Sequence, residues 1–399
     1  MAKNIYSDEW IFLFIPNVYH ASKVMKIVIA SDSFKGSLSS TDVAQAATRG
    51  IKAIYPDCEV VPVNVADGGE GTVEAIVEAL DGEIVHVVVS DPLGRPIQVR
   101  YGIAGEKAII EMAAASGLPL LEPKERNPWL TSTYGTGEMI MDAIRRGCCQ
   151  LLVGIGGSAT NDAGTGMLQA LGFKFYDSNG DEIIDCRGGR LQDIADIDDG
   201  CVPQSVREAE FIVACDVDTP FCGPEGAAIV FAPQKGADAE MGTKLDAGMV
   251  SFAKLVEEKY GVQIEHIAGA GAAGGMGGAF KSFLNATLKC GIEMVLDVIS
   301  FDQLIKGADL IITGEGKIDY QTSKGKTAAG VLARAKQQGI PVVAIAGYVE
   351  MCESVEQMGF AGIYPILEEK VALEIAMHPD FAAANVEKTT QRILQNNRH

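Results

Sequence analysis

The features that identify most small metal-binding or disulfide-linked proteins are missing from this sequence. It contains nine cysteines, an odd number, and no two of them form a C-x-x-C pair. This disfavours a zinc ribbon and a disulfide framework, and it fits a reducing cytoplasm best. The five histidines are scattered along the chain, which favours ordinary surface or core roles over a metal cluster.

Basic residues are also scarce. The chain has 33 Lys and Arg against 53 Asp and Glu, and its formal net charge is −20. Because such a charge repels nucleic acids and anionic membrane surfaces, we predict neither as a partner. A small anion could still bind where a few lysines and helix N-termini act together.

No apolar run is long enough to cross a bilayer. The longest candidate near the start, "WIFLFIP" (10–16), is too short, and it lacks the basic leader and cleavage site of a signal peptide. Strand-like sequence begins only with "MKIVIASD" at Met25. We therefore predict that residues 1–24 form an extension outside the fold.

Strand-like segments alternate with helical patterns at both ends of the chain. The apolar, β-branched segments are 26–31, 59–66, 308–314, 340–347 and 361–367, and helical patterns lie after Ser39, over 326–339 and over 382–395. This alternation predicts a parallel sheet with helices on both faces. The length of 399 residues, 47% of them hydrophobic, suits two such globular domains.

The middle of the chain has a different pattern. Segments 83–90, 96–103 and 107–113 are separated by short turns, which predicts antiparallel pairing, and further strands are expected at 150–156 and 210–217. Residues 177–208 are acidic and turn-rich, which predicts a surface excursion. We predict an α/β fold in which a doubly wound domain (25–69 and 291–399) is interrupted by an inserted mixed α/β domain (70–290).

Polar loops follow several strands of the predicted parallel sheet, at the edge where open sheets bind ligands. They are "SDSFKGS" (31–37), "ADGGEGT" (66–72), "TGEGKID" (313–319) and "AGY" (346–348). Their carboxylates and lysines are the groups that phosphoryl transfer needs to hold Mg²⁺, accept a proton and offset phosphate charge. For a single charge a helix cap or solvated loop is the better interpretation, whereas the set favours a site: Asp32, Asp67, Glu70, Glu315, Asp319, Lys35, Lys317 and Lys326.

Three glycine-rich stretches need separate interpretation. Residues 313–327 nearly match a P-loop, but position 320 is Tyr where that motif needs Gly. In "GIGGSATNDAGTG" (154–166), Gly154, Gly156 and Ala159 fit the dinucleotide pattern G-x-G-x-x-A, with Asp177 near the position of a ribose ligand. The stretch 269–280 has so many glycines that its spacing says little beyond close backbone approach to a ligand or another strand.

The dinucleotide pattern supports an alternative, an NAD-dependent hydroxy-acid dehydrogenase. Against it, "SATND" lengthens the loop and no catalytic His or Tyr–Lys pair is evident. A hydroxy-acid substrate would also need a cation for its carboxylate, which Arg95 or Lys235 could supply. The turn-rich segment 215–237, which carries Asp216 and Lys235, is equally compatible with a site and with structural turns.

The ordered set of motifs resembles bacterial glycerate kinases of the type I family. It comprises "KIVIASDSFKGSLSS", "ADGGEGT", "YGTGEMI", "GIGGSATNDAGTG", "FAPQKGA", "GAGAAGGMGGA" and "TGEGKIDYQTSKGK", and it runs from about Met25 to the C-terminal helix. The resemblance implies a flavodoxin-like domain interrupted by a second α/β domain. It also implies ATP-dependent phosphorylation of D-glycerate at the 2-hydroxyl, with 313–327 as a family-specific loop.

These observations lead to a predicted site in a cleft between the two domains, with ATP and Mg²⁺ as cofactors. The catalytic candidates are Asp319, which accepts or orients the hydroxyl proton, with Lys35 and Lys326 offsetting charge. Substrate or phosphate binding is assigned to Ser33, Gly68, Gly69, Arg95, Gly156, Gly157, Ser158, Asn161, Lys235, Gly314 and Gly316, and metal binding to Glu315, Asp67 and Asp216. The motif leaves open which of Glu315 and Asp319 handles the metal and which the proton, and a non-catalytic carbohydrate-acid sensor is a third alternative.

Overall fold

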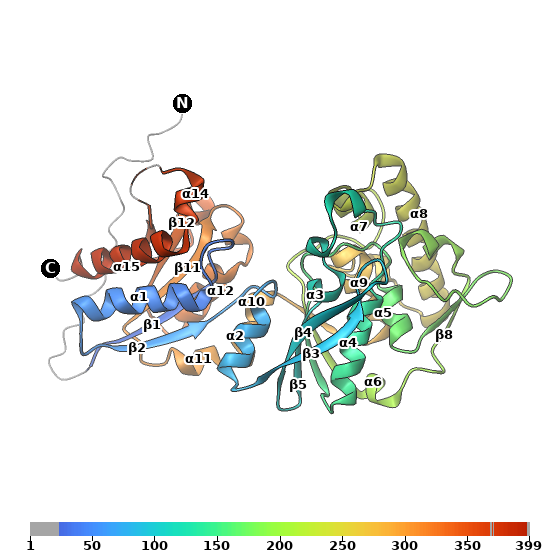
Figure 1. The fold of residues 1–399 in the computed structure, drawn as a ribbon, viewed down its shortest axis with the longest axis horizontal. Helices are drawn as coiled ribbons and strands as arrows, with labels where there is room; N and C mark the ends of the chain where they lie inside the picture. Colours follow the sequence, from blue (N-terminus) through green and yellow to red (C-terminus); the bar gives the residue numbers. More distant parts are fainter. Residues whose placement is uncertain (1–23, 368, 370, 397–399) are drawn as a thin grey trace. The chain divides into compact units, whose positions relative to one another are not determined.

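The computed structural model describes residues 24–367, 369 and 371–396 (Figure 1). The predicted extension 1–24 therefore lies, except for Val24, outside the described residues. Contacts divide the chain into two compact units, one ending at Ala66 and resuming at Leu296, the other spanning Asp67–Val295. We describe them separately as unit 1 and unit 2; that they are independent domains with the predicted boundaries stays a prediction.

Unit 1 is built on a five-stranded parallel sheet. The strand order is β13-β12-β11-β1-β2, where the strands are β1 (Lys26–Ser31), β2 (Glu59–Asn64), β11 (Leu310–Ile318), β12 (Val342–Val349) and β13 (Gly362–Pro365). Counted along this unit alone, the order is 2-1-3-4-5, which is the flavodoxin-like arrangement. The predicted doubly wound parallel sheet is confirmed.

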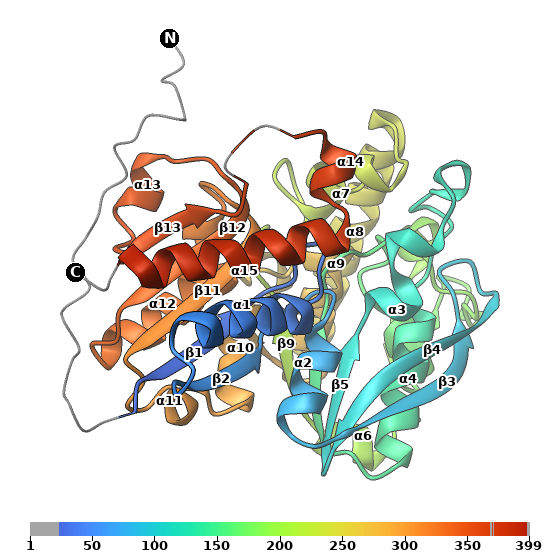
Figure 2. The same cartoon turned by 60° about the vertical axis from the view of Figure 1, so that its left-hand side comes forward.

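Helices cover both faces of this sheet. The helix α1 (Ser40–Ile54) begins with a capping box between Ser39 and Asp42, and it packs beside α15 (Pro379–Asn396) on one face, as Figure 2 shows. Their apolar residues share one core with alternate residues of the strands, such as Ile27 and Ile29. On the other face α12 (Thr327–Gln337) contacts β1, β11 and β12. The short helices of the unit are α11 (Phe301–Leu304), α13 (Glu353–Glu356) and α14 (Leu373–Ala376).

Strand β11 is longer than predicted. Its last residues pair with β12 alone, Glu315 opposite Ala346 and Lys317 opposite Tyr348. Residues 315–318 and Tyr348, which were predicted to lie in loops beyond the strands, are therefore strand, and the loop prediction was wrong for them. Polar residues can extend β11 because β12 still provides hydrogen-bond partners for their backbone groups. Glycine is needed at position 314, since a Cβ there would lie 2.6 Å from the carbonyl oxygen of Ile345 in β12.

Unit 2 contains a six-stranded mixed sheet in the order β10-β9-β6-β5-β4-β3. The first strands pair antiparallel, as predicted from their short turns, and the other four are parallel. The strands are β3 (Glu83–Ser90), β4 (Pro96–Ala104), β5 (Lys107–Glu111), β6 (Gln150–Gly154), β9 (Glu210–Ala214) and β10 (Thr287–Lys289); β7 (Lys174–Tyr176) and β8 (Asp196–Asp198) form a separate pair.

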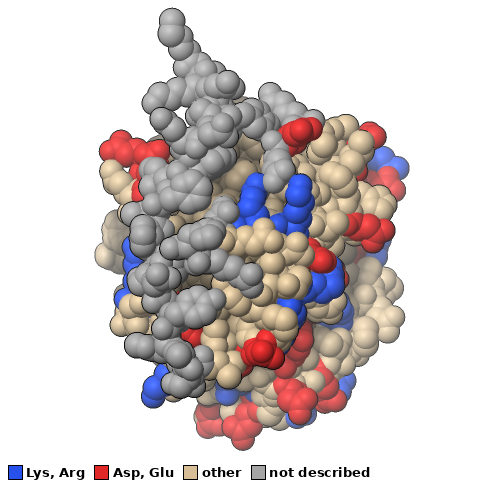
Figure 3. All heavy atoms as spheres, turned by 90° about the vertical axis from the view of Figure 1, so that its left-hand side faces the viewer, with Lys and Arg blue, Asp and Glu red and all other residues tan. Residues whose placement is uncertain are grey.

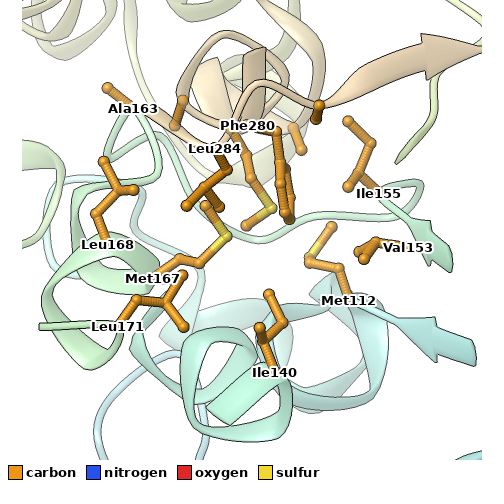
Figure 4. Packing of buried hydrophobic residues seen from close by; sticks show 14 of the residues in the cluster. Met112, Ile140, Val153, Ile155, Ala163, Met167, Leu168, Leu171, Phe280 and Leu284 are labelled. Carbon is orange, nitrogen blue, oxygen red and sulfur yellow. The ribbon is translucent and has the colours of Figure 1, made fainter. Parts of the chain in front are cut away.

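Most helices of unit 2 contribute buried residues to a large apolar core. They are α3 (Ala113–Ser116), α4 (Tyr134–Arg145), α5 (Thr165–Ala170), α6 (Gln204–Glu208), α7 (Ala227–Phe231), α8 (Ala239–Tyr260) and α9 (Ala272–Phe283), while α2 (Thr72–Ala79) lies outside this core and α10 (Gly291–Val298) runs from unit 2 into unit 1. Figure 4 shows Met112, Ile140, Met167 and Phe280 converging from different elements. Leu191, inside the segment predicted to be a surface excursion, is also fully buried, so that prediction was wrong for most of the segment's apolar residues, although Ile184 is 78% exposed.

The glycine run 269–280 packs against the protein's own backbone. A Cβ at Gly274 would lie 2.2 Å from the carbonyl oxygen of Thr160, and one at Gly275 would lie 2.8 Å from Cα of Ala163. Both glycines have a positive φ. Of the two interpretations left open by the sequence, close approach of another protein segment therefore accounts for these positions.

Charges of both signs occur together on the face that Figure 3 shows, despite the strong excess of acidic residues in the sequence. One exposed ion pair, between Arg49 Nε and Glu387 Oε2 at 2.8 Å, connects α1 to α15. Such pairs contribute at most about 1 kcal/mol, so burial of the apolar core dominates the stability of this face. No helix in the described residues is long and apolar enough to cross a membrane.

The contact between α1 and α15 can be tested at Gly50. A Cβ there would lie 2.6 Å from the Glu387 carbonyl oxygen, so Gly50→Val forces the helices apart. We expect the free energy of unfolding to fall by about 1–3 kcal/mol in urea titrations. Gln45→Val, on the exposed side of the same helix, is the control and should cost less than about 1 kcal/mol. Equal losses in both variants would contradict this packing.

Candidate functional site

Unit 1 brings two of the predicted segments together at the carboxyl edge of its sheet. Ser31, the last residue of β1, lies opposite Gly314 of β11, and the Asp32 N–H donates to the Gly314 carbonyl oxygen at 2.9 Å. The chain order reverses between β1 and β11, and ligands of open α/β sheets bind at such switch points. The segments 31–37 and 313–319 are thus joined directly.

Asp32 is the buried anchor of this edge. The side chain is largely inaccessible, and it accepts hydrogen bonds from the Thr327 hydroxyl at 2.9 Å and the Ser33 N–H at 2.7 Å. Since Thr327 opens α12, the carboxylate connects the loop after β1 to the first turn of that helix. Sequence reasoning missed Thr327, although its place directly after Lys326, at a helix start, was a usable signal.

Lys35 lies in a tight turn beside β11. The backbones of Phe34 and Leu38 exchange hydrogen bonds of 2.8 and 3.0 Å, which leaves Lys35 exposed between them. A Cβ at Gly316 would lie 3.6 Å from the Lys35 nitrogen, so β11 passes close to this turn. The structure therefore places the backbone of Lys35 next to Gly316, and a phosphate-binding role for these residues stays a prediction.

Asp319 belongs to a three-member ion-pair group just beyond β11. The Lys317 ammonium lies 2.8 Å from both Asp319 Oδ2 and Glu350 Oε2. The hydrogen bond from Lys317 lowers the pKa of Asp319, and the Gln321 N–H and the charge of Lys326 act in the same direction. Asp319 is therefore ionised at neutral pH. Glu350 was not predicted, although it directly follows β12 and so lies at the same sheet edge.

In unit 2, acidic side chains gather where β9 ends. The Gly291 N–H donates to Asp216 at 2.9 Å, and the Gly69 N–H donates to Asp67 at 3.2 Å. Desolvation raises the pKa of Asp216, and the nearby charge of Asp67 raises it further. Glycine at position 68 lets the loop that carries Asp67 approach the end of β9, because a Cβ added there would lie 2.5 Å from the Cβ of Ala214. The two carboxylates thus act on one another.

This pair fits a magnesium ion, which proteins usually hold through one or two carboxylates together with water and substrate phosphates. The mutual effect of the Asp67 and Asp216 charges is the repulsion that a bound cation would relieve. Within the described residues there is no group of three or more His, Cys, Asp or Glu side chains suited to a metal. Glu315 belongs to unit 1, where it is almost fully buried, and its role as a ligand stays a prediction.

The glycine loop after β6 lies over a buried lysine. Gly156 and Gly157 are exposed, and Gly157 has a φ of 75°. The Lys235 ammonium donates to the Ser158 hydroxyl at 2.7 Å and to the Thr160 carbonyl oxygen at 2.6 Å. The loop's conformation therefore depends on a side chain 75 or more residues away along the chain.

Lys235 is 1% exposed, and burial lowers its pKa to about 7. The nearby charge of Asp162 opposes this shift. Asp162 is itself fully buried and accepts hydrogen bonds from the N–H and the hydroxyl of Thr133, at 2.7 and 2.8 Å. The predicted Asn161 lies in the same loop, with its amide directed to the sulfur of Met249 at 3.2 Å.

The dinucleotide interpretation gains no support from the structure. The helix after the glycine loop, α5, begins only at Thr165, whereas a dinucleotide motif opens directly into its helix. Asp177 accepts hydrogen bonds from the N–H groups of Asn179 and Asp181, so it closes its own turn. Both features separate this loop from a ribose-binding arrangement.

Arg95 lies in the turn between β3 and β4, and protein carboxylates already contact it. Its guanidinium bonds to Asp91 at 2.5 Å and to Glu125 at 2.8 Å. These contacts hold the turn against the segment at 122–125. Binding of a substrate carboxylate by Arg95 stays a prediction.

Comparison with known proteins identifies the family. The model of the glycerate kinase family matches residues 27–397. This chain belongs to the glycerate kinase family. A glycerate kinase of Bacillus subtilis is 46% identical over 92% of this chain and 97% of its own length. The glycerate 2-kinase of Escherichia coli is 45% identical over 86% of this chain and 91% of its own length.

A solved structure agrees with this assignment. The crystal structure of a protein named glycerate kinase 2 from Salmonella typhimurium LT2 is similar with a TM-score of 0.85 and 42% identity, over 94% of this chain and 98% of that one. The resemblance drawn from the motifs is thereby confirmed, together with the fold class. Membership of this family makes the chain a phosphotransferase with an alcohol group as acceptor.

The buried contact between Asp32 and Thr327 predicts a measurable loss of stability. Thr327→Val keeps the shape but removes a donor to a buried carboxylate, so unfolding should become easier by about 1–3 kcal/mol. The measurement is chemical denaturation at pH 7. Thr48→Val, on partly exposed α1, removes a hydroxyl that bonds only within its own helix and should change stability by about 0.5 kcal/mol or less. No difference between the variants would contradict the anchoring role of Asp32.

Proposed function

We propose that this protein transfers the γ-phosphoryl group of ATP to the 2-hydroxyl of D-glycerate, giving 2-phospho-D-glycerate and ADP. The main support is the family match over nearly the whole described chain, together with the lysines and carboxylates at the switch point of unit 1. The position of transfer is supported by the name of the Escherichia coli relative, glycerate 2-kinase.

Asp319 is the proposed partner of the reacting hydroxyl. The ion pair with Lys317 lowers its pKa, so the carboxylate is ready to accept a hydrogen bond at neutral pH. Phosphoryl transfer depends mostly on positioning and on compensation of charge, with little demand for a strong base. A weakly basic carboxylate that orients the hydroxyl is sufficient for this role.

Lys35 and Lys326 are proposed to offset the negative charge of the transferred group. Lys35 is exposed in its turn, and Lys326 precedes α12, whose first N–H groups favour anions. The backbone near Ser33, Gly314 and Gly316 is proposed to approach the phosphates closely. Ser33 lies in the turn after β1, Gly314 lies at the middle of β11, and Gly316 lies in its second half.

Magnesium would be held by Asp67 and Asp216, with Glu315 as a further candidate, and it would neutralise charge on the phosphate oxygens. The residues of unit 2 proposed to bind glycerate or phosphate are Gly68, Gly69, Arg95, Gly156, Gly157, Ser158, Asn161 and Lys235. The first two share a loop with Asp67, and the last five belong to or contact the loop after β6.

We also propose that the protein works in the cytoplasm with small molecules and without a nucleic acid or membrane partner. All nine cysteines lie in the described residues and none forms a disulfide, which suits a reducing compartment. The net charge of −20 opposes binding to polyanions.

The activity is tested by coupling ADP release to a spectroscopic signal, with D-glycerate, glyoxylate and tartronate as candidate substrates. We expect ADP release that requires both D-glycerate and Mg²⁺. A change in NADH absorbance with hydroxy acids would instead support a dehydrogenase, and ligand binding without turnover would support a sensor. Either result would contradict the proposal.

The role of Asp319 is tested against a second carboxylate on the same lysine. Asp319→Asn should lower kcat by about 10²–10⁴-fold, because the hydroxyl loses its anionic acceptor. Glu350→Gln removes the other partner of Lys317 and should lower kcat by less than about tenfold. Steady-state kinetics at saturating substrates provide the comparison. Similar kcat values for the two variants would show that Asp319 acts only through the ion pair.

A further inference from the structure

The loop after β6 presents consecutive backbone donors. In the described part of the chain, the structure records no acceptor for the N–H groups of Gly156, Gly157 and Ser158. The groups on either side are used differently, since the Ala159 N–H donates to Ser116 and the Gly157 carbonyl accepts from Leu118. Successive N–H groups in a turn with one left-handed residue form a concave site for an anion.

The hydroxyl of Ser158 adds a fourth donor to this loop. Because the Lys235 ammonium donates to Ser158 Oγ, the hydroxyl hydrogen must be directed elsewhere. Ser158 is buried, at 8% exposure, directly after the exposed Gly156 and Gly157, while Lys235 is 1% exposed. The buried Lys235 ammonium can therefore influence a ligand of this loop only through the Ser158 hydroxyl.

The position of Lys235 is fixed from several sides. Its second hydrogen bond holds the Thr160 carbonyl oxygen, so the ammonium ties together both ends of the segment 158–160. The charged group that acts on it within the described residues is Asp162. Asp162 in turn accepts hydrogen bonds from Thr133, just before α4, and from the N–H groups of Gly164 and Gly166 around the start of α5.

We propose that Lys235 is a positioning residue that acts through Ser158, fixing its hydroxyl beside the three free amides so that the four donors bind one oxyanion of the ligand. The proposal rests on the function proposed above, in which this loop meets a substrate. The oxyanion is a carboxylate, as in glycerate, or a phosphoryl group, as in a nucleotide. Both present the same chemistry to the loop.

A bound oxyanion should favour the charged form of Lys235. The pKa of this lysine is about 7 in the free protein, so at pH 8 most of the side chain is neutral. Binding of the anion raises that pKa, and the complex therefore takes up a proton above pH 7. Affinity for the ligand should fall as the pH rises from 7 to 9, whereas well below pH 7 the lysine is already charged in the free protein and contributes no such dependence.

Titration calorimetry on the full chain tests the proposal, with D-glycerate and ADP as separate ligands. Ser158→Ala and Lys235→Met should each weaken one of them by about 10–100-fold, the effect of losing a hydrogen bond to a charged group. In turnover assays KM should rise by a similar factor while kcat changes less. Lys244→Met, which removes an exposed lysine of α8, is the control and should change neither affinity.

The two ligands separate the sources of the oxyanion. Weaker binding of D-glycerate assigns the loop to a carboxylate, and weaker binding of ADP assigns it to phosphate. At pH 8, titrations in buffers with different ionisation enthalpies should show proton uptake by the wild type that Lys235→Met loses.

Unchanged affinities in Ser158→Ala would overturn the proposal, and this test holds even if Lys235→Met fails to fold. Proton uptake that persists in Lys235→Met would also overturn it. Absence of binding to the wild type would overturn it as well. Normal ligand binding without ADP release would count against the kinase function alone.

Discussion

Parallel pairing between β1 and β11 is the constraint on which the site of unit 1 depends. The two strands are separated by more than 270 residues, yet their register is fixed from Ile27 opposite Leu310 to Ser31 opposite Gly314. A slip of one residue would turn the buried faces of both strands outward. The same register places Asp32 beside Gly314, where its carboxylate accepts a hydrogen bond from the Thr327 hydroxyl. Burial of the apolar side chains of the strands therefore determines where the polar loops lie.

The two units prepare their polar groups in different ways. In unit 1 the charges that we assign to catalysis are partly exposed, and Lys317, which is in contact with Asp319 and Glu350, keeps the Asp319 carboxylate ionised. In unit 2 the charges are buried, and Lys235 and Asp162 organise a backbone loop that is itself exposed. Exposed charges can respond to substrate, whereas buried ones fix geometry, because moving a buried charge away from its partners is costly.

Much of the architecture could be predicted from local patterns, and the errors have physical causes. Alternating apolar strands and helices predicted the parallel sheet, and short turns predicted the antiparallel strands of unit 2. The end of β11 was misplaced because polar residues and glycines look like a loop until β12 is known to pair with them. The contacts of Thr327 with Asp32 and of Glu350 with Lys317, and the burial of Lys235, could not be predicted, since each joins distant segments, although the positions of Thr327 and Glu350 at the sheet edge could have been noticed. Family resemblance identified the chemistry, but not these contacts.

Hydrogen–deuterium exchange of the full chain, with and without D-glycerate, ADP and Mg²⁺, tests most directly whether ligands bind at these two sheet edges. The account predicts slower amide exchange in peptides covering 31–37 and 313–327 of unit 1 and 154–161 of unit 2. The amides of Gly156 to Ser158 should show the largest change, because they have no recorded acceptor among the described residues. Protection confined to other parts of the chain, with these peptides unchanged, would contradict the account.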